Sequence, residues 1–309
     1  MQSLKTLLNI ESFLPERVIL PVRNEGDRFG FSYMVANRSK MKQTPIVRCS
    51  WVHGWHWYPL KLNDILKGSM EYIKRSNVVV ATQHQSSNLK KYIPNANIIA
   101  GGLPYNYVPN PELPRKKDAV IAFLPKSLKE NDEHLGARGF IDFLKKNRFK
   151  YNNPTICIFG GDADRIDLIK YVMDSDFNYI IGADPNDINS LLRMKIIFSF
   201  YEYAIGPTIG SYIPYAHTMG CRAAIVGEFV NVSKIKNSIY LNFDYIHENY
   251  PYLFCSDLDE FKLYVDWAHH EVGTVNTLPL EKVKELFGWG FIGSLNHYKR
   301  AVLSRVLKR

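Results

Sequence analysis

The stretch from Ile205 to Glu228 combines turn-forming residues with the start of a predicted helix. Gly206, Pro207 and Gly210 turn the chain sharply, and Ser211 stands where the helix should begin. Small residues at a helix start let a ligand approach free backbone N–H groups, and the helix dipole adds roughly half a positive charge there. The pattern predicts a phosphate or diphosphate site. The alternative is a tight loop in which Ser211 serves only as the N-cap.

A second set of candidates follows a predicted strand at 45–52. His53 comes directly after this strand and before Gly54, which permits close approach, so His53 is the candidate general base for a substrate hydroxyl. A positioned histidine contributes roughly 10²–10⁴ in rate. The neighbouring side chains could stack on or bind a sugar ring; they are Trp55, His56 and Trp57. The alternative is that the histidines bond loop carbonyls inside a small aromatic cluster.

Four more candidates follow predicted strands further along the chain, and they are Lys126, Ser127, Gly160 and Gly161. The ammonium group of Lys126 could neutralise a diphosphate leaving group without a metal. The glycine pair gives a strand-to-helix turn that needs little space. A solvated lysine and an ordinary turn are the alternatives. No GxxxxGK[ST] loop, HExxH motif or EF-hand loop occurs, so neither a metal site nor a cofactor is expected.

The first hundred residues alternate between strand and helix patterns. The predicted strands are 17–22, 45–52, 77–82 and 97–104, and the predicted helices are 31–42, 62–76 and 86–93. Ser86 or Ser87 is the expected cap of the last of these helices. The run 77–82 is apolar and β-branched, as in strands buried on both faces of a parallel sheet, and His84 after it is a second acceptor-side candidate. The alternation predicts an open, mostly parallel α/β sheet.

Four prolines between Pro104 and Pro114 predict a linker, because proline lacks an N–H donor and fixes φ. Beyond it the predicted strands are 118–125, 154–161, 177–183 and 195–203, and the predicted helices are 136–148, 164–175 and 185–195. Asn186 or Asp187 is the expected cap of helix 185–195. A final predicted helix spans 280–309, and from His297 onward its charge is almost wholly positive. Two α/β domains joined in this way place a ligand in the cleft between them, at the carboxyl ends of the strands.

The composition is that of a soluble globular protein: 309 residues, of which 46% are hydrophobic and 22% charged. No apolar run approaches the ~20 residues that span a bilayer, and no signal peptide is recognised, so a cytoplasmic location is expected. The four cysteines lie far apart and resemble small buried residues in a reducing compartment. The net charge of +9 attracts nucleic acid, anionic lipid headgroups or phosphorylated substrates, and the composition alone does not separate these three. The basic C-terminal helix could lie on an anionic membrane surface or pack across the domains.

Two Rossmann-like domains, a proline linker, a loop leading into a second-domain helix and a final helix together resemble the GT-B class of nucleotide-sugar glycosyltransferases. The resemblance covers nearly the whole chain. It implies an N-terminal acceptor domain at 1–112, a nucleotide-donor domain at 113–285 and a C-terminal basic helix at 286–309. It also implies metal-independent transfer. The segment from Trp51 to Gly54, with 59–61 (Pro-Leu-Lys), is similar to the WHG…PLK segment of teichoic-acid-type polyol-phosphate polymerases, although the aromatic stretch WHWY interrupts it here.

The GT-B resemblance implies a role for each candidate residue. The donor nucleotide would be held by Ser127, Gly160, Gly161, Thr208, Gly210, Ser211, Tyr212 and Glu228. His53 would deprotonate the acceptor, and Lys126 would stabilise the departing phosphate. Trp55, His56, Trp57 and His84 would line the acceptor side. Glu228 or Glu202 would replace the acidic residue that often holds sugar or ribose hydroxyls in this class, because Tyr215 and Ala216 stand where a Glu-Ala pair is usual.

The sequence therefore favours a glycosyltransferase of bacterial surface-polysaccharide assembly, such as that of capsule, O-antigen or lipopolysaccharide, with a glycan or lipid-linked acceptor. The close alternatives are a CDP-polyol phosphotransferase and a nucleotide-sugar epimerase of the same fold. A non-enzymatic polyanion-binding protein would need a continuous basic stripe, which the scattered charge does not provide, so no nucleic-acid partner is expected. An inactive scaffold of this fold also stays open.

Overall fold

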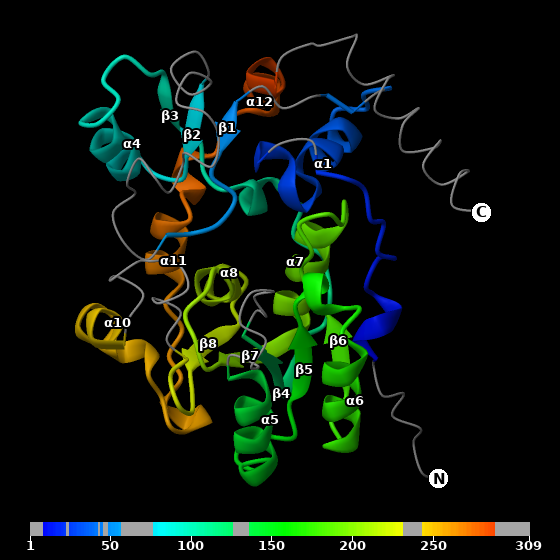
Figure 1. Ribbon diagram of the computed structural model, residues 1–309. Coiled ribbons are helices and arrows are strands. Elements are labelled where there is room, and N and C mark those ends of the chain that lie inside the picture. The colour runs from blue at the N-terminus through cyan, green and yellow to red at the C-terminus, as the bar shows by residue number, and fades with distance from the viewer. Residues whose placement is uncertain are drawn as a thin grey trace.

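The computed structural model describes residues 9–22, 25–42, 44–45, 49–56, 77–125, 136–230 and 243–287. Two parallel sheets form its framework (Figure 1). The first has the order β1-β2-β3, with β1 (Ser50–Trp51), β2 (Val78–Val80) and β3 (Ile98–Ala100). The second has the order β6-β5-β4-β7-β8, with β4 (Lys116–Phe123), β5 (Thr155–Ile158), β6 (Tyr179–Ile181), β7 (Tyr201–Gly206) and β8 (Arg222–Ile225). All the strand pairs are parallel, so the predicted α/β class with two Rossmann-like sheets is confirmed.

Helices alternate with these strands along the chain and pack on the sheets (Figure 1). Their bounds are α1 (Phe31–Arg38), α4 (Gln83–Lys90), α5 (Ala137–Lys146), α6 (Ile166–Asp174), α7 (Ser190–Phe200), α8 (Tyr212–Thr218), α10 (Phe243–Asn249), α11 (Val265–Glu271) and α12 (Leu280–Phe287). In α5 the helical period sends Phe140, Ile141 and Leu144 into the core, while Lys145 faces water. No helix in the described ranges combines the length and apolar character that crossing a membrane requires.

The prediction of a strand at 195–203 is wrong for most of its length. Residues 195–200 continue α7, and the strand β7 begins only at Tyr201. Because Lys195 to Phe200 are buried on every side of the helix, the run shows no amphipathic period that would separate helix from strand. The helix also starts later than predicted, at Ser190, because Asp187 accepts hydrogen bonds from the N–H groups of Val18 and Asn189.

The prediction of a first-sheet strand at 17–22 is also wrong. This segment makes a single antiparallel bridge, between Ile19 and Asp187, and lies along the loop that precedes α7. Polar side chains hold it there: Arg17 pairs with Asp184 at 2.7 Å, and the guanidinium of Arg193 donates to the carbonyl of Pro15. The N-terminal segment therefore packs on the second sheet's side of the molecule.

The other predicted elements agree with the structure in part. Helix 31–42 is confirmed as α1, and the helix predicted at 86–93 starts earlier, with Thr82 rather than Ser86 or Ser87 as its cap: the Thr82 hydroxyl accepts from the Gln85 N–H at 3.2 Å. The predicted helix 62–76 lies outside the described residues. Of the predicted helix 280–309, the part up to Phe287 is confirmed as α12, and the basic end after it lies outside the described residues.

The segment after the second sheet returns to the first sheet (Figure 1). Phe287 in α12 meets Phe31 of α1 and Trp51 of β1 edge to face, with ring centroids 5.3 and 6.0 Å apart. The proline-rich segment 104–114 begins with a 3-10 turn at Pro104–Tyr107, whose tyrosines are buried. The linker thus contributes to a core that both sheets share. The domain boundaries at 112 and 285 stay predictions.

Candidate functional site

The second sheet reverses its strand order between β4 and β7. From β4 the chain moves outward to β5 and β6, and it then returns to the other side for β7 and β8. In open parallel sheets this reversal leaves a crevice outside the carboxyl ends of the two central strands. Here those ends are Phe123 of β4 and Gly206 of β7, and the glycine-rich turn predicted to bind phosphate follows Gly206 directly. The turn that the sequence predicts to bind phosphate therefore lies at the reversal of the strand order.

The structure brings the His53 loop into contact with this turn. The backbone N–H of Trp55 donates to the Ser211 hydroxyl oxygen at 3.0 Å, and the Tyr215 hydroxyl donates to the His53 carbonyl at 3.1 Å. Ser211 is the N-cap residue of α8, but its side chain makes no capping hydrogen bond to the helix. Its hydroxyl therefore joins the two loops instead of capping the helix. The imidazole of His53 is half-buried and lies 5.3 Å from the ring of Phe29.

Within the turn itself, Tyr212 covers the backbone. Its ring stacks on Phe123 with centroids 4.8 Å apart, and its hydroxyl donates to the Thr208 carbonyl at 3.0 Å. Burial raises the pKa of the Tyr212 hydroxyl, which stays protonated. The hydroxyl of Thr208 is buried and makes no hydrogen bond within the described residues. A buried hydroxyl without a partner costs free energy, so Thr208 has an unused hydrogen-bonding group in the turn that follows β7.

Gly160 and Gly161 follow β5, beside β4 on the same edge of the sheet. The N–H of Gly160 donates to Ala183 at 2.7 Å, and its carbonyl accepts from Arg17 at 3.3 Å. A Cβ at Gly160 would lie 2.4 Å from the Cβ of Asp184, so this turn can be made only without a side chain. The close packing explains the glycine at this position, and the predicted donor contacts of both glycines stay predictions.

The acidic residues considered for the sugar hydroxyls lie in different places. Glu202 is at the amino end of β7, where it pairs with Arg222 at 3.0 Å and accepts from the N–H of Asp118. It therefore lies at the edge opposite to the crevice, and the suggestion that Glu202 could serve there is wrong. Glu228 follows β8 and is exposed. Its loop reaches the crevice, because the N–H of Val230 donates to the Pro207 carbonyl at 2.7 Å.

The predicted acceptor-side residues do not gather at one surface. Trp55 is buried: its indole N–H donates to Glu271 at 3.1 Å, and its ring meets Trp267 and Tyr250 edge to face. His56 is half-buried in the same loop. His84 is exposed in the first turn of α4, with a ring nitrogen 2.9 Å from the Asn88 side-chain nitrogen. Trp57, Lys126 and Ser127 lie outside the described residues.

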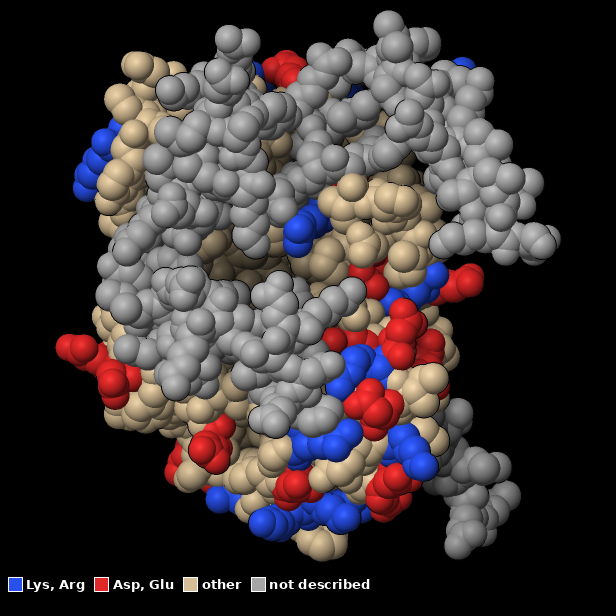
Figure 2. Space-filling view, in the orientation of Figure 1, with Lys and Arg blue, Asp and Glu red and all other residues tan. Residues whose placement is uncertain are grey.

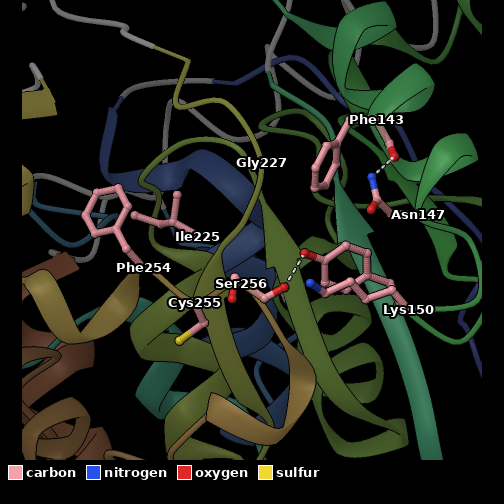
Figure 3. A pocket seen from close by; sticks show the side chains of 9 residues that line it. Phe143, Asn147, Lys150, Ile225, Gly227, Phe254, Cys255 and Ser256 are labelled. Atoms are coloured by element: carbon pink, nitrogen blue, oxygen red, sulfur yellow. Dashed lines mark hydrogen bonds between the residues drawn. The ribbon is translucent and has the colours of Figure 1, made fainter.

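A separate shallow cavity of about 380 Å³ lies beside the carboxyl end of β8 (Figure 3). Its lining residues are Phe143, Asn147, Lys150, Tyr151, Ile225, Gly227, Phe254, Cys255 and Ser256. The hydroxyl of Tyr151 donates to the Ser256 carbonyl at 2.9 Å. None of the predicted site residues that the structure describes lines this cavity. In the described part of the chain, no group of histidine, cysteine and acidic side chains gathers at metal-binding distance.

Charges of both signs alternate over the second-sheet helices on the face seen in Figure 2. Several of them are paired, such as Arg138 with Asp167 at 3.4 Å and Arg148 with Asp176 at 2.7 Å. The described residues of this face therefore carry no continuous basic stripe of the kind that a nucleic acid would follow.

Sequence reasoning missed three buried polar residues around the site. The sequence draws attention to Tyr215 only because it stands where a Glu-Ala pair is usual in the GT-B class. Lys195 lies where the predicted helix 185–195 meets the predicted strand 195–203, and His217 belongs to no motif. Lys195 is buried, with its ammonium 4.9 Å from the ring centroid of Tyr105 and 2.5 Å from the Asn110 side-chain oxygen. Their polar side chains within apolar runs were the available signal, because such residues are rarely buried without a partner.

No family model matches this chain, and no curated protein is similar to it. Among the solved structures, 18 chains are similar to it, including the three that follow. A mutant of S. aureus TarM, in complex with fondaparinux, α-GlcNAc-glycerol and UDP, has 14% identity and a TM-score of 0.37 over 77% of this chain and 50% of its own. A putative UDP-N-acetylglucosamine 2-epimerase from Listeria monocytogenes has 11% identity and a TM-score of 0.40 over 79% of this chain and 65% of its own.

Sucrose-phosphate synthase from Thermosynechococcus elongatus has 13% identity and a TM-score of 0.28 over 77% of this chain and 60% of its own. The chain therefore spans between half and two thirds of the length of these proteins. The similarities agree with the resemblance found in the sequence.

Proposed function

We propose that this protein is a glycosyltransferase that moves a sugar from a nucleotide-sugar donor to a hydroxyl of a glycan or lipid-linked acceptor. One observation carries the proposal: the glycine-rich turn from Gly206 to Gly210 lies at the reversal of the strand order, and the next residue, Ser211, contacts the loop of His53 from the other sheet. The turn that we propose to bind phosphate and the loop that carries the candidate base thus lie next to each other.

The donor side of the proposal rests on the crevice between β4 and β7. The turn from Gly206 to Gly210 follows β7 at this place, and the buried hydroxyl of Thr208 makes no hydrogen bond within the described residues. Lys126 comes three residues after the end of β4 in the sequence and would bring a positive charge to the same edge. A donor diphosphate bound there would need no metal ion, because backbone dipoles and the ammonium would balance its charge.

The chemical step would be a direct displacement. His53 would take the proton of the acceptor hydroxyl while the acceptor oxygen forms its bond to the anomeric carbon of the sugar. The bond between that carbon and the donor phosphate oxygen would break, and the electron pair would leave with the nucleoside diphosphate. Lys126 and the Ser211 end of α8 would stabilise the departing negative charge.

The first test is a thermal-shift screen of the full chain against UDP, CMP, CDP, GDP and dTDP, each with and without magnesium. A nucleotide at 100 times its Kd should stabilise the protein by about 2.7 kcal/mol, and we expect one nucleotide to do so without metal. Thr208→Val keeps the shape of the side chain and should weaken the shift. Thr155→Val, at the amino end of β5 and thus at the opposite edge, is the matched control and should keep it.

A shift with heparin or DNA and with none of the nucleotides would instead support a polyanion-binding protein and end the transferase proposal. If a nucleotide binds, release of the nucleotide leaving group is then measured: UDP from UDP-glucose and UDP-N-acetylglucosamine, GDP from GDP-mannose, dTDP from dTDP-rhamnose and CMP from CMP-N-acetylneuraminate. His53→Ala should lower the rate of release at least 10²-fold, since a general base contributes that much.

The place in bacterial surface-polysaccharide assembly and the contact with the inner face of the membrane are also part of the proposal. Their support is the basic end of the chain, which carries Lys299, Arg300, Arg305, Lys308 and Arg309. Such a segment gains roughly 1 kcal/mol per basic residue near an anionic surface. The full chain should therefore float with vesicles that contain phosphatidylglycerol but not with pure phosphatidylcholine. Binding to neither, or equally to both, would contradict the membrane contact.

A further inference from the structure

Ser211, the N-cap residue of α8, and Tyr215 within α8 hold the His53 loop on either side of Gly54. Ser211 and Tyr215 are four residues apart, so they lie on one face of the helix. The Ser211 hydroxyl accepts from the Trp55 N–H at 3.0 Å, and the Tyr215 hydroxyl donates to the His53 carbonyl at 3.1 Å. Both contacts go to backbone atoms, so they fix where the loop runs rather than which way one side chain turns.

Gly54 lets the loop come this close to the helix. A Cβ at this position would lie 3.1 Å from the Ser211 hydroxyl oxygen, closer than an ordinary van der Waals contact. A side chain here would therefore push the loop away from α8 and lengthen both hydrogen bonds.

Tyr215 is itself held in place. Its ring stacks on Tyr105 of the linker with 4.0 Å between centroids and 4° between planes, and only 7% of the residue is exposed. The Tyr105 ring is in turn contacted by Lys195, whose ammonium lies over it. Burial raises the pKa of the Tyr215 hydroxyl, so it remains a hydrogen-bond donor over the whole working pH range. Tyr215 is thus a rigid donor aimed at the carbonyl of the candidate base.

We propose that Tyr215 is a positioning residue that sets the location of His53 relative to the glycine-rich turn of the second sheet. The catalytic role of His53 in this inference rests on the proposed function. It assigns Tyr215 no contact with substrate. Its part is to keep the backbone of His53 at a fixed distance from the donor turn, since a misplacement of about 1 Å in a catalytic group can cost 10²-fold in rate.

The test compares Tyr215→Phe with Tyr151→Phe. Tyr215→Phe removes only the hydroxyl and keeps the stack on Tyr105. Tyr151 also is buried and also donates to a backbone carbonyl, that of Ser256 at 2.9 Å, but it lies beside the cavity near β8. The two variants lose the same kind of bond at different places. With the five nucleotide sugars named above, Tyr215→Phe should lower kcat for release of the nucleotide leaving group about 10-fold, with the donor KM unchanged.

Tyr151→Phe should leave both constants unchanged while losing a similar amount of thermal stability. Equal losses of kcat in both variants, or a rise in the donor KM with kcat intact, would overturn the positioning role. The pH profile gives a further check: the limb that reports the base should keep its midpoint in Tyr215→Phe, because the variant moves His53 without changing the residue that titrates.

Amide hydrogen exchange tests the contact without any activity. In the wild type the Trp55 amide should exchange slowly, and both Ser211→Ala and Tyr215→Phe should speed its exchange about fivefold, the effect of losing one net hydrogen bond. Unchanged exchange in both variants would overturn the inference whatever the activity. Faster exchange in a protein that neither binds nucleotides nor cleaves nucleotide sugars would support the contact and overturn the proposed function instead.

Discussion

Gly273 lies directly against the carbonyl group of Ala81, so that a Cβ at position 273 would stand 1.9 Å from the Ala81 oxygen. The residue also has a φ of +74°, in the left-handed region that favours glycine. Next to it, the Val272 carbonyl accepts from the Leu103 N–H at 3.1 Å and from the Asn106 side chain at 2.8 Å. These contacts hold the segment after α11 against the end of the first sheet.

Gly273→Ala should therefore destabilise the protein by about 3 kcal/mol or more, because both the space and the backbone conformation are unavailable to alanine. The measurement is the midpoint of urea unfolding. Gly139→Ala is the matched control: Gly139 is exposed on α5, no atom lies within 4 Å of the added Cβ, and the helix should gain up to about 1 kcal/mol. Equal shifts of the unfolding midpoint in the two variants would contradict a special role of the contact between Gly273 and Ala81.

Lys195 should make the protein less stable at pH 7 than an apolar residue would. Burial, with a smaller effect of the Arg38 charge, lowers the pKa of Lys195 from 10.5 to about 8. The folded protein therefore binds fewer protons than the unfolded chain between pH 8 and 10.5, and stability should rise with pH across this window. Lys195→Met should flatten this rise and stabilise the protein at pH 7 by about 1 kcal/mol.

The measurement is the free energy of unfolding from urea titrations at pH 7, 8, 9 and 10. Lys146→Met, at an exposed position of α5, is the control and should change neither the stability nor its pH dependence. A Lys195→Met protein that is less stable at pH 7 would mean that the contacts with Tyr105 and Asn110 outweigh the burial of the charge.

His217 should make the protein sensitive to acid. Its side chain is fully buried, its Nδ1 accepts from the Tyr264 N–H at 3.4 Å, and burial lowers its pKa from 6.5 to about 4. Between these values the unfolded chain binds a proton that the folded protein does not. Stability is therefore complete above pH 6.5 and falls as the pH drops towards 4, by about 3 kcal/mol in all.

Thermal midpoints between pH 7 and 4 test this. His217→Gln should show a weaker fall over this range than the wild type, even if it is less stable at pH 7. His84→Gln, which changes an exposed histidine of α4, should keep the full dependence. If all three proteins lose stability in parallel, carboxyl groups and not His217 account for the acid sensitivity.

The sequence determined the local elements wherever a pattern was unambiguous. The β-branched run Val78–Val80 is a strand, the amphipathic period of 137–146 is the helix α5, and Ser211 stands at the start of α8, as predicted. The same reasoning failed at 195–200, because a run that is buried on all sides has no period to read. It failed at 17–22 because the partners of that segment, Asp184 and Asp187, lie far along the chain.

Only the tertiary structure decided which candidate residues meet. The order β6-β5-β4-β7-β8 puts the glycine-rich turn at the reversal of the sheet, and the Tyr215 hydroxyl reaches a histidine carbonyl 162 residues away in the chain. It likewise separated Glu202 from the crevice and buried Trp55 against Trp267. The physical reason is that turn and helix propensities act over a few residues, whereas contacts across the molecule depend on how whole sheets pack, which no local pattern encodes.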